Sequence, residues 1–401
     1  MLKIANRMSR VHSDIRGPLY EESVRMIASG IDVLGLNSGN PANFGFELPE
    51  SVRNAAMQGL DKAVAYCTSQ GMNNAREAIV GYYKQKGFQG VSAANVFIGN
   101  GVSELAQMLM LSLLDDGDEV LLPTPNYSLW SNSVYLGGGN PVYYRIDEAQ
   151  GWCPDTSDIK KNISPRTKAI VIINPNNPTG VLYPKQVLLD IMEICRQNNI
   201  IVISDEIYDR LVMDGKVHYS CAQLAPDLPV ITLSGLSKSH IICGFRCGWL
   251  VLTSQNNQLE PLRDALSRLS SMRICGNTVS QLVIPAALAD SESTQQLLIP
   301  GGRFYEQRKV VVDAINSTDL LSVVPNDATF YVFPKLNRKK IKLTDREFCF
   351  GLLKHKHILV IPGSGFEYAE PDHFRIVMLP EAQKLEKAMK DTIEYLEEIA
   401  E

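Results

Sequence analysis

Between about residues 95 and 255, short β-rich runs alternate with segments whose apolar residues recur at helical spacing. This alternation is typical of a parallel sheet, in which crossover helices connect successive strands. The run 168–173 is apolar and β-branched enough to be buried on both faces of such a sheet. A turn-rich segment, 174–180, follows it, and a helical pattern then extends from Pro184 to Asn198. We therefore expect an α/β domain built around a mostly parallel sheet.

The chain is too long for one hydrophobic core, because 401 residues correspond to two or three domains at about 150 residues each, and we expect two. Beyond about residue 290 the pattern changes to helices and short strands, and it ends in a charged helix from Glu381, which indicates a smaller α+β domain. We expect residues 1–45 to form an N-terminal arm and part of the small domain, 46–290 the large α/β domain, and 291–401 the small domain.

Composition excludes several classes of partner. The formal net charge is −5, which favours neither nucleic acid nor an anionic membrane, and no apolar run approaches the ~20 residues that cross a bilayer. The eight cysteines form no CxxC pair, and His355 and His357 have no third ligand nearby, so we expect reduced thiols and no metal site. The first fourteen residues lack an apolar segment suited to secretion, and we expect an arm on a cytoplasmic protein that binds small molecules.

Three of the expected strands, 168–173, 200–204 and 230–234, end close to polar side chains. These are Asn177 after the first strand, Asp205 and Tyr208 after the second, and Lys238 after the third. Ligands of open parallel sheets bind beyond the carboxyl ends of the strands, so we expect these side chains to converge on one crevice. An amine beside a carboxylate at neighbouring strand ends is what a cofactor bound as a Schiff base requires.

A fourth feature indicates a phosphate site. The strand 96–98 is followed by Gly99-Asn-Gly101 and an apolar helix, and the N-terminus of a helix binds anions. A nicotinamide dinucleotide fits less well, because Glu104 replaces the third glycine of GxGxxG. A serine hydrolase is also weakly supported, since the pattern GxSxG lacks its last glycine. Together, the lysine, the carboxylate and the phosphate turn suggest pyridoxal 5′-phosphate.

An ordered set of motifs over nearly the whole chain resembles the class I/II pyridoxal-phosphate-dependent aminotransferases of fold type I. The matching segments are residues 37–41, Tyr66 with Gly71, 99–103, Tyr127, 174–180, 205–208, 234–238, Arg246 and 373–375. Segments 15–18, 40–46 and 300–308 are similar, more narrowly, to bacterial glutamate–pyruvate (alanine) aminotransferases. The resemblance implies a mostly parallel seven-stranded sheet, a homodimer, and amino acids and 2-oxo acids as substrates.

The resemblance also implies roles for individual residues around the cofactor. Lys238 would bond to the cofactor and act as the base, Asp205 would pair with the pyridine nitrogen, Tyr208 and Asn177 would contact the phenolic oxygen, and Tyr127 would stack on the ring. Gly101, Val102, Ser103 and Arg246 would hold the phosphate, with Tyr66 arriving from a second subunit. Many relatives carry a serine where this chain has Gly235, and Ser234 or Ser237 would substitute for it.

On the substrate side, Arg375 matches the arginine that receives the α-carboxylate, and Gly39 and Asn177 would complete this contact. Arg16 would recognise the second carboxylate of glutamate or 2-oxoglutarate, although Ser13 replaces an aromatic residue that some relatives show nearby. An aminotransferase for another amino acid, a β-lyase or a decarboxylase of the same fold would use the same lysine, aspartate and arginine, so these alternatives stay open. A DNA-bound regulator and a nicotinamide oxidoreductase are the more remote alternatives.

Overall fold

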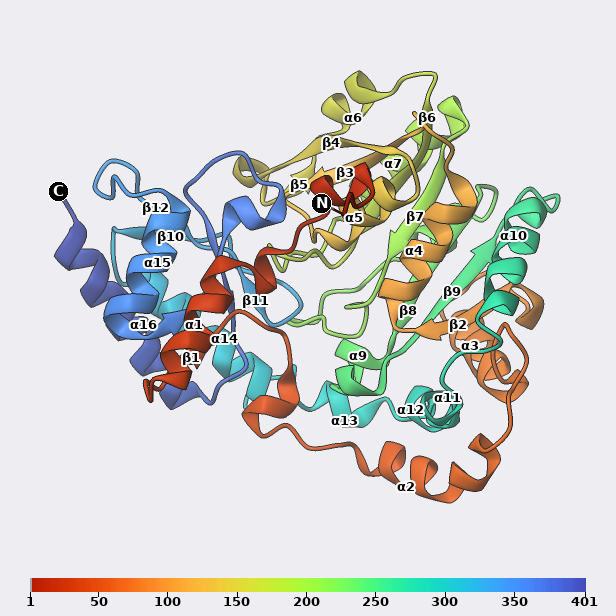
Figure 1. Ribbon diagram of the computed structural model, residues 1–401, viewed down its shortest axis with the longest axis horizontal. Coiled ribbons are helices and arrows are strands. Elements are labelled where there is room, and N and C mark those ends of the chain that lie inside the picture. Colours follow the sequence, from red (N-terminus) through yellow and green to blue (C-terminus); the bar gives the residue numbers. More distant parts are fainter. Residues whose placement is uncertain (1) are drawn as a thin grey trace.

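The computed structural model describes residues 2–401. An eight-stranded sheet organises the larger part of the molecule (Figure 1). In spatial order its strands are β2 (Val96–Asn100), β9 (Cys247–Thr253), β8 (Val230–Gly235), β7 (Ile201–Asp205), β6 (Thr167–Ile173), β3 (Glu119–Thr124), β4 (Asn140–Asp147) and β5 (Cys153–Pro154). The five strands from β8 to β4 are parallel, whereas β9 is antiparallel to both of its neighbours. The expected mostly parallel sheet is confirmed.

The sheet differs from the expected seven strands by β5, which pairs antiparallel with the edge strand β4. Seven strands have five or more residues, and β5 has two. Two residues are too few to display an alternating or apolar strand pattern, so β5 carries no signal in the sequence. The difference concerns only the edge of the sheet.

Helices cover both faces of this sheet (Figure 1). The helices of this part of the molecule are α2 (Glu50–Gly59), which packs on α11 and α12 instead of on the sheet, α3 (Asn73–Gln85), α4 (Val102–Leu113), α5 (Leu129–Leu136), α6 (Thr156–Asn162), α7 (Lys185–Asn198), α8 (Cys221–Leu224), α9 (Leu236–Ser239), α10 (Glu260–Met272), α11 (Thr278–Leu282), α12 (Ile284–Ala289) and α13 (Glu292–Gln295). Alternate residues of β6 belong to different apolar clusters: Ile170 and Ile172 pack with α3 and α7, and Val171 and Ile173 pack with α4 and α10. The strand is therefore buried on both faces, as its composition predicts.

The crossover between β6 and β7 follows the sequence closely. Helix α7 begins at Lys185, directly after Pro184, and ends at Asn198. Asn199 then adopts a left-handed conformation with φ of 54°, which asparagine tolerates better than most residues. Pro184 thus precedes the helix instead of occupying its first turn.

The smaller part of the molecule joins both chain ends in one apolar cluster. Its elements are α1 (Pro18–Ala28), β1 (Leu34–Gly35), α14 (Arg303–Asn316), β10 (Leu321–Ser322), β11 (Tyr331–Val332), β12 (Lys335–Leu336), α15 (Asp345–Lys356), β13 (Ile358–Leu359), β14 (Ile361–Pro362), β15 (Phe374–Val377) and α16 (Ala382–Ile399). Strand β1 pairs in parallel with β13, and Leu19 and Leu36 pack in the cluster that holds α15 and α16. These contacts support the proposed domain division, in which the N-terminal residues join the small domain.

Candidate active site

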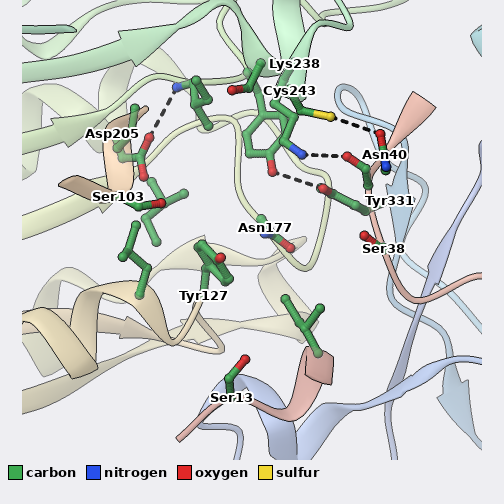
Figure 2. A pocket seen from close by; sticks show the side chains of 18 of the residues that line it. Ser13, Ser38, Asn40, Ser103, Tyr127, Asn177, Asp205, Lys238, Cys243 and Tyr331 are labelled. Atoms are coloured by element: carbon green, nitrogen blue, oxygen red, sulfur yellow. Dashed lines mark hydrogen bonds between the residues drawn. The ribbon is translucent and has the colours of Figure 1, made fainter. Parts of the chain in front are cut away.

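A cavity of about 670 Å³ lies beyond the carboxyl ends of β6, β7 and β8, between the two parts of the molecule. It is lined by twelve of the residues singled out from the sequence: Arg16, Gly39, Val102, Ser103, Tyr127, Asn177, Asp205, Tyr208, Ser237, Lys238, Arg246 and Arg375. Figure 2 shows Lys238, Asn177, Tyr127 and Asp205 around the same space. The convergence expected from the strand ends is therefore present, and it extends to residues from the N-terminus and the small domain.

Lys238 lies in the short helix α9 that directly follows β8, so the strand end fixes the position of its backbone. Its Nζ donates a hydrogen bond to the Gly39 carbonyl at 2.8 Å and lies 5.6 Å from the centre of the Phe330 ring. No carboxylate of residues 2–401 lies within 4.0 Å of this amine. The amine is therefore held in place by a neutral partner and is open to the cavity.

Gly235, three residues before the lysine, is explained by close packing. A Cβ atom at Gly235 would lie 2.5 Å from the Cys247 carbonyl oxygen and 2.9 Å from Gly248 Cα, both of them backbone atoms. A serine therefore does not fit this backbone. Ser237 lines the cavity, whereas Ser234 is buried and donates to the Glu206 carbonyl at 3.2 Å, which leaves Ser237 as the hydroxyl on this side.

Asp205 is the last residue of β7 and is 5% exposed. Trp130 Nε1 donates to its Oδ2 at 2.9 Å, and the Ile207 backbone N–H donates to its Oδ1 at 3.3 Å. Burial raises the pKa of Asp205 to about 6, and the two hydrogen bonds offset only part of that effect. Within the described chain no cation lies within 4.0 Å of the carboxylate, so a cationic N–H entering the cavity would be a favourable partner.

Tyr208 and Asn177 reach the cavity from loops that follow β7 and β6. The Tyr208 hydroxyl lies 3.2 Å from the Tyr331 hydroxyl, and burial raises the pKa of Tyr208 well above its usual value. The Asn177 side-chain oxygen accepts a hydrogen bond from Arg375 Nη1 at 2.9 Å. Burial also raises the pKa of Tyr127, so both phenols stay protonated at neutral pH.

The phosphate-type turn lies at the start of α4. Gly101 precedes the helix with φ of 78°, a conformation that favours glycine, and the backbone N–H groups of the first helical turn have no partner inside the helix. Arg246 spans the turn, because its Nη2 donates to the Asn100 carbonyl at 3.3 Å and its Nη1 to the Cys243 carbonyl at 3.0 Å. Gly101 itself lies behind Arg246 and does not line the cavity, where Val102 and Ser103 do.

Arg375 projects from β15 and is 1% exposed. Its Nη1 bonds to Asn177, its Nη2 donates to the Asn37 carbonyl, and its Cζ lies 4.5 Å from the centre of the Tyr331 ring and 4.8 Å from that of Phe366. All of these partners are neutral, and burial lowers the pKa of the guanidinium. A buried cation without a counter-ion is costly, so this position favours an anionic ligand such as a carboxylate.

The N-terminal arm closes one side of the cavity. Ser13, Ile15 and Arg16 line it, and the turn Asp14–Arg16 is held by a bidentate pair between Asp14 and Arg346, with distances of 3.0 and 3.1 Å. Farther back, the side-chain amide of Asn132 in α5 accepts a hydrogen bond from the His12 backbone N–H and donates one to the His12 carbonyl. The arm thus contacts both parts of the molecule, and Figure 1 shows the N-terminus beside α5.

Two predicted site residues do not line this cavity: Gly101, which lies behind Arg246, and Tyr66. The Tyr66 side chain is 78% exposed, and other apolar side chains are also exposed in the same stretch of chain and beside the segment 271–273, which bonds to Ser69. These are Met57 (69%), Leu60 (52%), Val64 (88%) and Met272 (81%). A contribution of Tyr66 to a cavity therefore requires a second copy of the chain.

Several lining or supporting residues were not identified from the sequence: Trp130, Asn37, Ser38, Asn40, Cys243 and Tyr331. Trp130 and Tyr331 contact Asp205 and Tyr208 across 75 and 123 residues of chain. Such long-range pairs leave no local pattern in a single sequence. The polar run Asn37–Asn40 was noted only for its motif and for Gly39.

Comparison with known proteins gives consistent matches along the whole chain. A family model described as aminotransferase class I and II matches residues 31–391. Glutamate-pyruvate aminotransferase AlaA of Haemophilus influenzae is 44% identical over 98% of this chain and 97% of that protein. Among solved structures, an aminotransferase from Escherichia coli is 40% identical over the whole of both chains, with a TM-score of 0.98. An alanine aminotransferase from Pyrococcus furiosus is 36% identical over 99% of this chain and 100% of that one, with a TM-score of 0.94.

Proposed function

The chain belongs to the class I and II aminotransferases, pyridoxal-phosphate-dependent enzymes that move an amino group between an L-amino acid and a 2-oxo acid, and we propose that glutamate and pyruvate are its preferred pair. The names of relatives that are 40–44% identical over nearly the full length support this pair. The observation that carries the proposal is one cavity holding a free amine at Lys238, a buried carboxylate at Asp205 and a buried guanidinium at Arg375. Each of the three lacks an oppositely charged partner in the described chain.

The residues fit pyridoxal phosphate at three points. Asp205 offers a desolvated carboxylate for a ring N–H, α4 and Arg246 offer donors for the phosphate, and Lys238 offers an amine for the aldehyde. Tyr208 and Asn177 would bind the phenolic oxygen, and Tyr127 would cover the ring. When bound, the cofactor supplies an aldehyde that combines with amines and a ring that withdraws electrons from the substrate Cα.

The protein groups would then divide the work of proton transfer and charge stabilisation. Asp205 would keep a proton on the ring nitrogen, because a carboxylate in a buried site strongly favours a cationic neighbour. The Lys238 Nζ would take the proton from the substrate Cα and return it on the adjacent cofactor carbon. A lysine suits this role, since a neutral amine accepts a proton readily and its flexible four-carbon stem lets the nitrogen reach both carbon atoms.

Arg375 would bind the substrate α-carboxylate through its planar fork, with Asn177 and Gly39 beside it. Arg16, on the arm that borders the same cavity, would bind the second carboxylate of glutamate or 2-oxoglutarate. This arrangement would let the same site accept pyruvate, which has no second carboxylate. The arm would also exclude water from that side of the cavity.

A homodimer is part of the proposal, because Tyr66 would complete the phosphate site of the partner subunit. The exposed apolar side chains around Tyr66 support an interface there. A cytoplasmic location also remains a prediction, supported by the eight unpaired cysteines. No helix within residues 2–401 is long and apolar enough to span a membrane.

The test is product formation by the purified protein. With L-glutamate and pyruvate we expect L-alanine and 2-oxoglutarate to accumulate, and with L-cystathionine we expect no ammonia or pyruvate. Lys238→Ala should lower kcat by about 10²–10⁴-fold and remove the borohydride-sensitive visible absorbance band. Lys168→Ala, on an exposed strand end paired with Asp118, is the matched control and should change neither. Ammonia from cystathionine would instead support a lyase, and a colourless protein after addition of pyridoxal phosphate would reject the proposal.

A further inference from the structure

Tyr331 is a buried cavity residue to which the proposed function gives no role. It belongs to β11 of the small domain, is 2% exposed, and lines the cavity next to Lys238 and Arg375. Figure 2 shows its hydroxyl directed toward the space between Lys238 and Asn177. A buried tyrosine hydroxyl usually needs a hydrogen-bond partner, and the partner here belongs to the active site.

Two contacts connect Tyr331 to residues of the proposed machinery. Its hydroxyl accepts a hydrogen bond from the Tyr208 hydroxyl at 3.2 Å, and the two rings meet edge to face at 5.6 Å. On its other side, the ring faces the Arg375 guanidinium, with Cζ 4.5 Å from the ring centre. Tyr331 therefore touches both the residue proposed for the phenolic oxygen and the residue proposed for the α-carboxylate.

The backbone around Tyr331 is tied to the large domain, which limits where the side chain can move. The Ala328 N–H donates to the Gly180 carbonyl at 3.0 Å, and the Thr329 N–H donates to the Leu211 carbonyl at 2.8 Å. A Cβ atom at Gly39 would overlap the Tyr331 hydroxyl oxygen, so this glycine leaves the space that the hydroxyl occupies. The position of the hydroxyl is thus set by both parts of the molecule.

The chemistry of two facing tyrosine hydroxyls constrains their hydrogen bonds. Each hydroxyl has one proton to donate and two lone pairs that accept. If Tyr208 donates to a phenolic oxygen in the cavity, its proton is no longer available to Tyr331. The hydrogen bond between the tyrosines then requires Tyr331 to donate, and this donation directs the Tyr208 proton into the cavity.

We propose that Tyr331 is a positioning residue with two functions: its hydroxyl directs the Tyr208 proton toward the phenolic oxygen of the cofactor, and its ring holds the Arg375 guanidinium in place for the substrate carboxylate. This inference rests on the proposed function. The two functions use different parts of the side chain, so different substitutions separate them.

Tyr331→Phe removes the hydroxyl and keeps the ring. A hydrogen bond donated to the phenolic oxygen stabilises negative charge there and weakens the hold on the proton shared with the Lys238 nitrogen. Without Tyr331 to direct Tyr208, we expect the visible absorbance of the cofactor-loaded enzyme to titrate about 0.5–1 pH unit higher, which corresponds to about three- to tenfold in proton affinity. KM for L-alanine should stay within about twofold.

Tyr331→Leu removes the ring as well, and with it the cation–π contact to Arg375. We expect KM for L-alanine to rise about tenfold, as expected for a desolvated contact of this kind. The absorbance titration should shift as it does in Tyr331→Phe. Both variants should therefore shift the spectral midpoint, but only Tyr331→Leu should raise KM. A merely structural role of Tyr331 would not separate these two quantities.

The matched control is Tyr144→Phe, which removes a buried hydroxyl bonded to the Val171 carbonyl at 2.8 Å, outside the cavity. It should lower the unfolding temperature and leave both the midpoint and KM unchanged. An unshifted midpoint in Tyr331→Phe, or equal increases of KM in both Tyr331 variants, would overturn the inference. Alanine formation and the visible band of the wild-type enzyme test the proposed function, and the Tyr331 variants test this inference. Failure of one is therefore distinguishable from failure of the other.

Discussion

The two walls of the cavity are built in different ways. The cofactor wall consists of strand ends and turns packed backbone against backbone: a Cβ atom at Gly248 would lie 2.6 Å from both Gly101 C and Val102 N. The substrate wall consists of Arg375, Tyr331 and the arm, which are held mainly by side-chain contacts between distant segments. The difference indicates that the main chain fixes the cofactor position, whereas the substrate position depends on individual side chains. Substitutions in the two walls should therefore have different kinetic consequences.

The largest expected effect on the substrate wall comes from Arg375→Ala. Two charged hydrogen bonds to the carboxylate are each worth about 1.5–3 kcal/mol, so kcat/KM for L-alanine should fall by at least about 10²-fold. Ethylamine, which has no carboxylate, provides the control substrate, and its slow reaction with the cofactor-loaded enzyme should be nearly unaffected. Equal losses with both substrates would contradict the proposed role of Arg375. Arg375→Lys should recover only part of the loss, because a lysine lacks the planar fork.

On the cofactor wall, Asp205→Asn should change how stability depends on pH in the cofactor-free protein. Burial raises the pKa of Asp205 from 3.8 to about 6, so its ionisation costs folding free energy. Stability from this group is fully present below pH 4 and is lost as pH rises through about 6, by about 3 kcal/mol in total. At pH 8 the cofactor-free Asn variant should be the more stable protein.

Denaturant unfolding from pH 4 to 8 measures this difference between the two proteins. Glu206, whose pKa burial raises to about 7, titrates in both and cancels in the comparison. If the free energies of unfolding of the two proteins change in parallel with pH over the whole range, burial does not raise the cost of ionising Asp205. Added pyridoxal phosphate should stabilise the wild type far more than the variant.

The smallest effect concerns the arm. Arg346→Gln breaks the bidentate pair with Asp14, in which the Arg346 side chain is 45% exposed and screened by solvent. Partly exposed pairs contribute about 0.2–1 kcal/mol, so KM for glutamate should rise up to about fivefold at low salt, and less at high salt. Arg263→Gln, which breaks a pair with Glu260 on α10, is the control and should not change KM. A change in kcat without a change in KM would show that the arm does not contribute to glutamate binding.

The same contrast between the walls determines how much the sequence could predict. Asp205 ends the apolar strand β7, and Lys238 lies three residues after the end of its neighbour β8; the geometry of parallel sheets brings such ends together. The two-residue strand β5 and the contact of Trp130 with Asp205 had no comparable local signal. The sequence shows that Gly235 differs from the residue in many relatives, but it does not show why. The Cys247 carbonyl leaves no room for a Cβ atom at Gly235, and it lies there because β8 pairs with β9.

For the substrate wall, resemblance supplied what local pattern could not. Arg375 was identified by its motif, and its burial between two aromatic rings emerged only from the fold. Tyr331 lies in a short strand of two residues and was missed, since nothing in the neighbouring sequence relates it to Tyr208. Contacts between residues that are distant in the chain and meet only in the fold cannot be predicted from a single sequence.

The glycine contacts at Gly235 and Gly248 have a practical consequence for redesign. Adding a single carbon at either position would force two main-chain segments apart, so these two positions tolerate no larger side chain. The small polar side chains of Ser13 and Ser38 border the same hollow without that restriction. A library intended to alter which amino acids are accepted should therefore vary these serines and leave the glycines untouched.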